Sequence, residues 1–284
     1  MNVSASSPSG GSNSLAVTIQ NVTVPSLGFG TFQLKGENCA DAVRHALSVG
    51  YRHVDTARMY QNEADVGRAV KDSGVNREDL FITSKIWQED CRPEKVSAAV
   101  ESSLHALKTD FLDLLLIHWP EPDIPLQETL GAMRAQQAAG HIRKVGVSNF
   151  PPSLLLEALS DGPIFCNQVE YHPLLGQTRV LEICREHDVL LAAYAPLAHG
   201  KLIDHGVLAE IGAKHGKSAS QTALRWLLQQ DHVVALPRSS KPTHITENFM
   251  VNDFELDRGE MSRIDALPKN QRFFNPPFAP DWES

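Results

Sequence analysis

Residues 50–63 have the sequence GYRHVDTARMYQNE, which predicts a short strand at 53–55, a loop, and a helix beginning near Asn62. Asp55 then ends the strand, and Tyr60 lies in the loop that follows. In barrels of parallel strands, catalytic side chains come from the C-terminal strand ends and from the loops after them. Asp55 and Tyr60 are therefore candidate active-site residues.

Two later stretches are also predicted strands that end in a polar residue, as the strand at 53–55 does. The run FITSK at 81–85 ends in Lys85, and the run LLLIH at 114–118 ends in His118. An aspartate, a tyrosine, a lysine and a histidine from successive strand ends would place a proton-donating phenol among groups that tune it.

The rest of the chain alternates between predicted strands and helices. The strands are expected at 27–32, 53–55, 81–85, 111–117, 142–147, 165–169, 189–193 and 233–236. The helices are expected at 39–49, 64–73, 96–107, 126–139, 152–159, 178–187, 219–229 and 243–251, with extra helices at 206–214 and 257–267. This alternation fits a closed barrel and an open doubly wound sheet equally well. The G-x-G at 28–30 lacks the third glycine and the acidic residue of a dinucleotide-binding fingerprint.

Three stretches in register resemble signatures of the aldo-keto reductase family. They are residues 50–63, the run LHALKTDFLDLLLIHWP at 104–120 and the run LPRSSKPTHITEN at 236–248. The similarity extends from about Val17 to the C-terminus and is greatest to the bacterial branch, whose members reduce diketo-gluconates, glyoxals and small aldehydes. It implies one α/β domain at 15–284, a (β/α)8 TIM barrel with an N-terminal β-hairpin (16–20 and 22–24) and a C-terminal loop over the active site.

Carbonyl reduction requires a hydride on the carbon and a proton on the oxygen. The resemblance implies that Tyr60 is the general acid. A tyrosine has an ordinary pKa near 10, and the ammonium of Lys85 is expected to lower it. Asp55 would hold Lys85 by an ion pair, and His118 would orient the substrate.

Each of these residues also has an ordinary structural explanation. Asp55 could cap a helix, Lys85 could be a solvated loop lysine, and His118 could be a core histidine. Two other functions are also compatible with the sequence. One is a metal-free Schiff-base aldolase that uses Lys85 on the same barrel, and the other is a non-enzymatic nucleotide-sensing regulatory subunit.

The resemblance further implies a nicotinamide nucleotide site. Its residues would be Thr31, Ser148, Asn149, Gln168, Tyr194, Pro196, Leu197, Arg238, Ser239, His244, Glu247 and Asn248. Ser148, Asn149 and Gln168 match positions that hold the nicotinamide carboxamide, and Tyr194 matches the aromatic residue that stacks on the ring. Arg238 stands where lysine is usual, and His244 where arginine is usual. We therefore expect NADPH to be preferred and NADH to be accepted.

Aromatic residues are expected to form the substrate pocket. Phe32, Trp87 and Trp119 each follow a predicted strand, so their side chains should face the mouth of the barrel. The tail contributes further aromatic residues that could close over the pocket: Phe273, Phe274, Phe278 and Trp282. The histidines show no metal-ligand spacing, so we expect no metal.

Composition limits the classes of partner. The chain has 284 residues, 42% of them hydrophobic, and a formal net charge of −8, which argues against binding to nucleic acid or anionic membranes. No apolar run approaches the roughly 20 residues needed to span a bilayer. Four cysteines without CxxC spacing indicate reduced thiols and a cytoplasmic protein. Residues 1–14 are expected to be a disordered leader, the partner a small carbonyl compound, and the protein a monomer.

Overall fold

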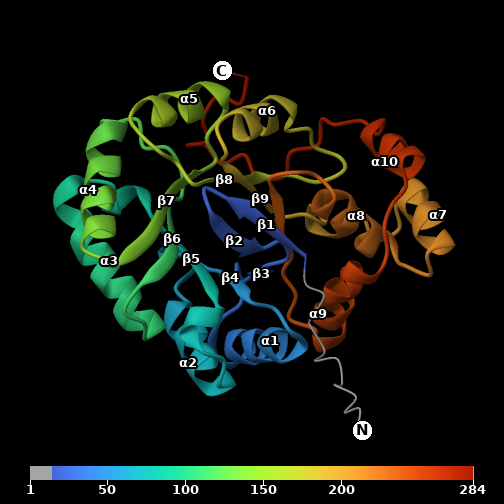
Figure 1. The fold of residues 1–284 in the computed structure, drawn as a ribbon, viewed down its shortest axis with the longest axis horizontal. Coiled ribbons are helices and arrows are strands. Elements are labelled where there is room, and N and C mark those ends of the chain that lie inside the picture. Colours follow the sequence, from blue (N-terminus) through green and yellow to red (C-terminus); the bar gives the residue numbers. More distant parts are fainter. Residues whose placement is uncertain (1–14, 284) are drawn as a thin grey trace, which may run out of the picture.

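The computed structural model describes residues 15–283, and the expected leader at 1–14 lies outside them. In the described part, eight parallel strands form one sheet, and their order in the sheet follows their order along the chain. Figure 1 shows these strands at the centre of the molecule with the helices around them. The strands are β3 (Phe29–Gly30), β4 (His53–Asp55), β5 (Phe81–Ile86), β6 (Leu112–Ile117), β7 (Ile142–Ser148), β8 (Cys166–Glu170), β9 (Leu190–Tyr194) and β10 (Val233–Leu236).

The sheet closes into a barrel where its first strand meets its last. Leu27 forms a parallel bridge with Ala235, and the backbone N–H of Gly28 donates to the Ala235 carbonyl at 2.9 Å. The first strand was expected to span 27–32, but its regular ladder is shorter. The chain turns after Thr31, whose carbonyl accepts a hydrogen bond from the Leu34 N–H at 3.0 Å. The prediction of a (β/α)8 TIM barrel is confirmed.

The helices pack on the outside of the barrel. They are α1 (Gly36–Val49), α2 (Glu63–Ser73), α3 (Pro93–Leu107), α4 (Leu126–Ala138), α5 (Pro152–Ser160), α6 (Thr178–Glu186), α7 (Gly206–Lys214), α8 (Ala219–Leu228), α9 (Pro242–Phe249) and α10 (Arg258–Asp265). The extra helix between β9 and α8 has the expected bounds. Helix α9 ends earlier than expected, because a 3-10 turn over Met250–Asp253 replaces its last residues. In residues 15–283, no helix is both long and apolar enough to cross a membrane.

An N-terminal hairpin closes one end of the barrel. Strands β1 (Ala16–Ile19) and β2 (Val22–Pro25) pair antiparallel, as expected from the sequence. Ile19 and Val24 have no exposed surface and join the cluster of side chains inside the barrel, which includes Phe81, Leu114 and Phe165. The interior of the barrel is therefore a packed core at this end.

The four cysteines are all buried and unpaired. Burial raises the pKa of Cys39, Cys91 and Cys184 to about 12. These groups are therefore neutral thiols at physiological pH, and they serve as small apolar side chains in the core.

Two helical glycines give a test of the packing around the barrel. A Cβ at Gly67 in α2 would lie 2.5 Å from the Ala106 carbonyl oxygen, whereas a Cβ at Gly131 in α4 meets nothing within 4 Å. Gly67→Ala should therefore destabilise the fold by about 1–3 kcal/mol through overpacking. Gly131→Ala should stabilise it by up to about 1 kcal/mol through helix propensity. Urea unfolding measures both, and equal effects would contradict this view of the α2–α3 contact.

Candidate active site

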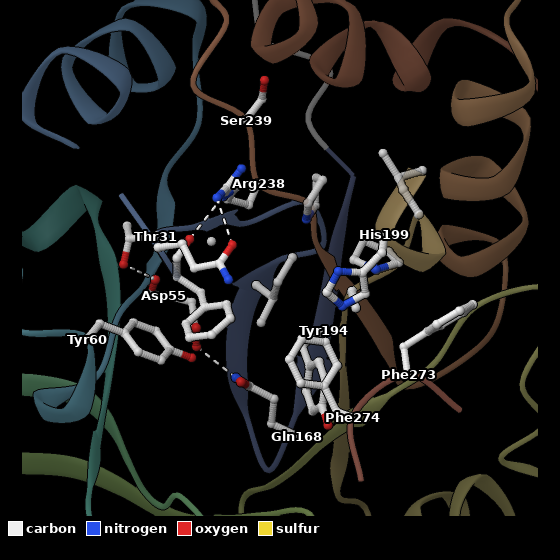
Figure 2. Close-up of a pocket in the computed structure, with 18 of the residues that line it drawn as sticks. Thr31, Asp55, Tyr60, Gln168, Tyr194, His199, Arg238, Ser239, Phe273 and Phe274 are labelled. Atoms are coloured by element: carbon white, nitrogen blue, oxygen red, sulfur yellow. Dashed lines mark hydrogen bonds between the residues drawn. The ribbon is translucent and has the colours of Figure 1, made fainter. Parts of the chain in front are cut away.

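A cavity of about 840 Å³ lies at the C-terminal ends of the barrel strands. Except for Lys85, which is fully buried behind the cavity, and Trp282 of the tail, every site residue expected from the sequence lines it. The lining residues expected near the reaction are Asp55, Tyr60, His118, Phe32, Trp87 and Trp119. Those expected to hold a nucleotide are Thr31, Ser148, Asn149, Gln168, Tyr194, Pro196, Leu197, Arg238, Ser239, His244, Glu247 and Asn248. Figure 2 shows ten of the lining side chains labelled.

An ion pair between Asp55 and Lys85 lies at the base of this cavity. The Nζ of Lys85 donates to Asp55 Oδ1 at 2.6 Å, to the Thr56 carbonyl at 2.9 Å and to the Tyr60 hydroxyl at 3.4 Å. The other carboxylate oxygen of Asp55 accepts a hydrogen bond from Gln168 Nε2 at 2.7 Å. Each of the three Nζ protons therefore has a partner, and the buried charge is compensated.

The polar residues of the 50–63 motif hold the loop that carries Tyr60. Thr56 donates through its hydroxyl to Asn62 Oδ1 at 2.8 Å. Asn62 in turn donates through Nδ2 to the carbonyls of Thr31 at 2.8 Å and Leu34 at 2.9 Å. These bonds tie the loop after β4 to the loop after β3, so the position of the Tyr60 phenol is fixed from both sides.

The electrostatics of the cluster differ from the sequence-based expectation. Lys85 was expected to lower the pKa of Tyr60, but burial and then the negative charge of Asp55 raise the pKa of Tyr60 well above its ordinary value. The expectation is wrong because the ammonium lies 2.6 Å from the Asp55 carboxylate and 3.4 Å from the phenol. Asp55 therefore offsets part of the effect of the ammonium on the pKa of Tyr60, and burial, the larger cause, outweighs the rest. Burial also lowers the pKa of Lys85, although Asp55 opposes this effect.

His118 is a neutral imidazole in this environment. Burial lowers the pKa of His118 well below its ordinary value, and the positive charge of Lys85 lowers it further. The ring lies between the side chains of Tyr60 and Trp87, with centroid separations of 5.5 Å and 5.1 Å. His118 can therefore act as a hydrogen-bond donor or acceptor but not as a charged acid near neutral pH.

A hydrogen-bonded group of side chains lies at the C-terminal ends of β7, β8 and β9. The hydroxyl of Ser148 donates to the Gln168 carbonyl at 2.9 Å. Asn149 donates through Nδ2 to the His118 carbonyl at 2.9 Å, and its Oδ1 accepts the Tyr194 hydroxyl proton at 2.8 Å. Asn149 adopts a φ of 63°, a left-handed conformation that asparagine tolerates better than most residues. The network orients these side chains before any ligand binds.

Arg238 follows β10 and lies beside the end of β3. Its Nε donates to the Phe32 carbonyl at 2.9 Å, and one terminal nitrogen donates to Gln33 Oε1 at 3.1 Å. The two dashed lines from Arg238 in Figure 2 mark these bonds. One donor edge of the guanidinium therefore contacts the loop after β3, whereas the sequence suggested that it grips a phosphate near Ser239 and His244.

Aromatic side chains form the wall beside Tyr60 and His118. Phe32 packs against Tyr60 with ring centroids 5.0 Å apart. Phe278 from the tail lies 5.8 Å from Trp87 and 5.4 Å from Trp119. The tail therefore covers this end of the cavity, as expected, and encloses it with apolar rings.

Several lining residues were not identified from the sequence. They include Gln33, His199, Ser218 and Ser220, which join the expected residues along the cavity. Ser218 begins α8 with a capping box, in which its hydroxyl accepts the Gln221 N–H at 3.2 Å. The S-x-x-Q pattern could have predicted this helix start. Nothing in the sequence places it beside the cavity, because that depends on how the long connection from β9 folds back.

Sequence comparison assigns the chain to a family. A sequence model of the aldo/keto reductase family matches residues 26–269. The chain is 45% identical over 254 residues to a glyoxal reductase of Bacillus subtilis (strain 168), with 88% of this chain and 91% of the relative covered. The chain therefore belongs to the aldo/keto reductase family.

Two further proteins are similar to this chain over a comparable share of its length. Methylglyoxal reductase DkgB of Escherichia coli O157:H7 is 36% identical over 268 residues, which cover 92% of this chain and all of that protein. The solved structure of the aldose reductase from Schistosoma japonicum superposes with a TM-score of 0.88 at 32% identity and covers 93% of this chain and 95% of that one. The family match at residues 26–269 thus includes all eight strands of the barrel.

Proposed function

We propose that this protein reduces small aldehydes and ketones to alcohols, with NADPH as the preferred hydride donor and NADH also accepted. Family membership supports the reaction class, and relatives named for glyoxal and methylglyoxal support small dicarbonyl substrates. The observation that carries the proposal is the Tyr60 phenol, which lines the cavity 3.4 Å from the buried Lys85 ammonium. A cytoplasmic location and a monomeric state stay predictions of the sequence.

Tyr60 provides the proton. Hydride transfer to the carbonyl carbon leaves negative charge on the oxygen, which must be protonated. Tyr60 gives its hydroxyl proton to that oxygen, and its raised pKa keeps the phenol protonated at neutral pH until then. The resulting phenolate lies beside Lys85, whose positive charge stabilises it. Lys85 therefore acts on the product of the proton transfer, while Asp55 holds the ammonium in place.

His118 and the aromatic wall orient the substrate. A neutral imidazole can donate one N–H to the carbonyl oxygen without competing with Tyr60 for the role of acid. The rings of Phe32, Trp87 and Trp119 exclude water from the reacting carbonyl and contact its apolar substituent.

The order of side chains along the cavity fits a nicotinamide nucleotide, which supplies a hydride when bound. Amide groups of Asn149 and Gln168 line the cavity, where they can hold a carboxamide, and the Tyr194 ring can stack on the nicotinamide. The loop with Pro196 and Leu197 follows. Another part of the cavity is lined by Arg238 and Ser239, which precede α9 and offer a cation and a hydroxyl group to phosphates. His244, Glu247 and Asn248 of α9 line the same part.

The geometry speaks against the two alternative functions. A Schiff-base aldolase needs a lysine that a carbonyl can reach, yet Lys85 has no exposed surface and all three of its protons are engaged. A purely nucleotide-sensing subunit has no need for a proton donor beside an ion pair, so measured turnover separates it from a reductase.

Replacement of the phenol tests the proposed acid. Tyr60→Phe keeps the ring but removes the proton, so kcat for methylglyoxal with NADPH should fall by about 10²–10⁴-fold. Nucleotide binding, measured by fluorescence titration, should change little. Tyr51→Phe is the matched control, because Tyr51 is a buried tyrosine that donates its hydroxyl to the Ile245 carbonyl and does not line the cavity. Should Tyr60→Phe turn over as fast as Tyr51→Phe, Tyr60 is not the acid.

Cofactor preference depends on cations near the 2′-phosphate of NADPH. Charged hydrogen bonds contribute roughly 1.5–3 kcal/mol each, or on the order of 10- to 150-fold in affinity. Arg238→Ala should therefore weaken NADPH by about that factor and leave NADH unchanged, whereas His244→Arg should tighten NADPH alone. Fluorescence titration gives both dissociation constants.

Gln33→Ala provides the control for Arg238. It removes one acceptor of the guanidinium on the loop after β3 but leaves the cation in place. NADPH affinity should therefore be maintained or increased in Gln33→Ala. Equal weakening of NADPH and NADH by Arg238→Ala would mean that the phosphate is recognised elsewhere.

A further inference from the structure

The C-terminal tail is held by one buried carboxylate. Glu170 ends β8, and its side chain has no exposed surface. Its Oε1 accepts the backbone N–H of Phe273 at 2.9 Å, and its Oε2 accepts the N–H groups of Phe273 at 3.1 Å and Phe274 at 3.0 Å. The Nε2 of His172 lies 3.1 Å from Oε1. A single side chain therefore binds two consecutive peptide groups of the tail.

These contacts keep the carboxylate charged. Burial by itself raises the pKa of Glu170, but the hydrogen bonds from His172 and from the two tail N–H groups outweigh it, and the pKa lies below its ordinary value. Hydrogen bonds to an ionised acceptor are about twice as strong as those between neutral groups. The tail is thus attached to the barrel more firmly at this point than the packing of its rings alone would allow.

The clamped peptide places Phe274 in the wall of the cavity. The Phe274 ring lies 6.0 Å from Phe32, 5.3 Å from Tyr194 and 4.7 Å from His199, measured between ring centroids. Phe273 lies 5.8 Å from His199. In Figure 2, Phe273 and Phe274 are on the same side of the cavity as Tyr194 and His199. Phe274 therefore connects the substrate wall at Phe32 with the ring expected to stack on the nicotinamide.

We propose that Glu170 is a positioning residue that sets substrate specificity, because its carboxylate fixes the peptide that carries Phe274. The inference rests on the proposed carbonyl reduction. A substrate with a bulky apolar substituent contacts the Phe274 wall and depends on the clamp. A substrate no larger than methylglyoxal is held by Tyr60 and His118 and does not depend on it.

Glu170→Gln weakens the clamp with little change in volume. A glutamine loses the negative charge and one of the two acceptor oxygens, so its hydrogen bonds to the tail N–H groups are weaker, and its NH2 group faces the N–H of Phe273. The KM for phenylglyoxal should rise by about tenfold, the low end of the range for one charged hydrogen bond. The kcat and KM for methylglyoxal, which carries the same dicarbonyl group without the ring, should stay close to the wild-type values.

A double variant shows whether Glu170 acts through Phe274. Phe274→Ala should raise the KM for phenylglyoxal, and adding Glu170→Gln should raise it little further, because the two changes remove the same wall. If the two rises in KM multiplied in the double variant, Glu170 would not act through Phe274, and the proposal would be overturned. If Glu170→Gln does not fold, Phe274→Ala by itself tests the proposal. An unchanged KM for phenylglyoxal in Phe274→Ala would then overturn it.

Limited trypsin digestion of the folded protein tests the clamp without activity. Trypsin cleaves after Arg272, and the next two peptide N–H groups are those bound by Glu170. Release of the peptide 273–284, followed by mass spectrometry, should be about tenfold faster in Glu170→Gln than in the wild type, by the same reasoning. An unchanged cleavage rate would overturn the clamp.

Glu260 provides a matched control. It is also buried, lies 2.9 Å from His215 Nε2 and accepts a backbone N–H, that of Asp257, at 3.1 Å. It does not line the cavity. Glu260→Gln should lower stability yet leave the KM ratio of the two dicarbonyls unchanged.

An equal rise of both KM values in Glu170→Gln would indicate a general structural role and overturn the proposal. If the wild type reduces neither dicarbonyl, the proposed function fails, while the trypsin result still tests the clamp.

Discussion

The ion pair between Asp55 and Lys85 is the interaction on which the rest of the site depends. A buried ammonium is costly unless it is paired and its protons are used, and here Asp55, Thr56 and Tyr60 use all three. The pair joins the ends of β4 and β5, and Gln168 extends it to β8 across the barrel. Tyr60 is therefore positioned by charge at its hydroxyl and by the polar loop residues around it.

Strand β8 connects this ion pair with the tail. Gln168 and Glu170 are two residues apart, so their side chains emerge on the same face of the strand. Gln168 binds the free oxygen of Asp55, and Glu170 binds the peptide that carries Phe274. One strand thus supports both the proton donor and the wall of the substrate pocket, which explains how the tail can be far away in sequence and still be fixed relative to Tyr60.

The sequence predicted the barrel, the extra helix Gly206–Lys214 and the convergence of the candidate residues, because periodicity and strand-end positions encode these features locally. It did not predict the raised pKa of Tyr60, which arises from burial and from the relative distances to Asp55 and Lys85. It also missed the orientation of Arg238 and the role of Glu170. Their partners are about a hundred or more residues away, so only the closed barrel brings them together.

The coupling between Asp55 and Lys85 is the central claim, and a double-mutant cycle on kcat tests it most directly. Lys85→Met removes the charge that stabilises the Tyr60 phenolate, and Asp55→Asn leaves the ammonium without its fixed direction. Residues that act as one unit are strongly non-additive. The kcat of the double variant, measured at saturating methylglyoxal and NADPH, should therefore equal that of Lys85→Met alone. A double variant in which the two losses multiply would show that Asp55 and Lys85 act independently and would contradict the account.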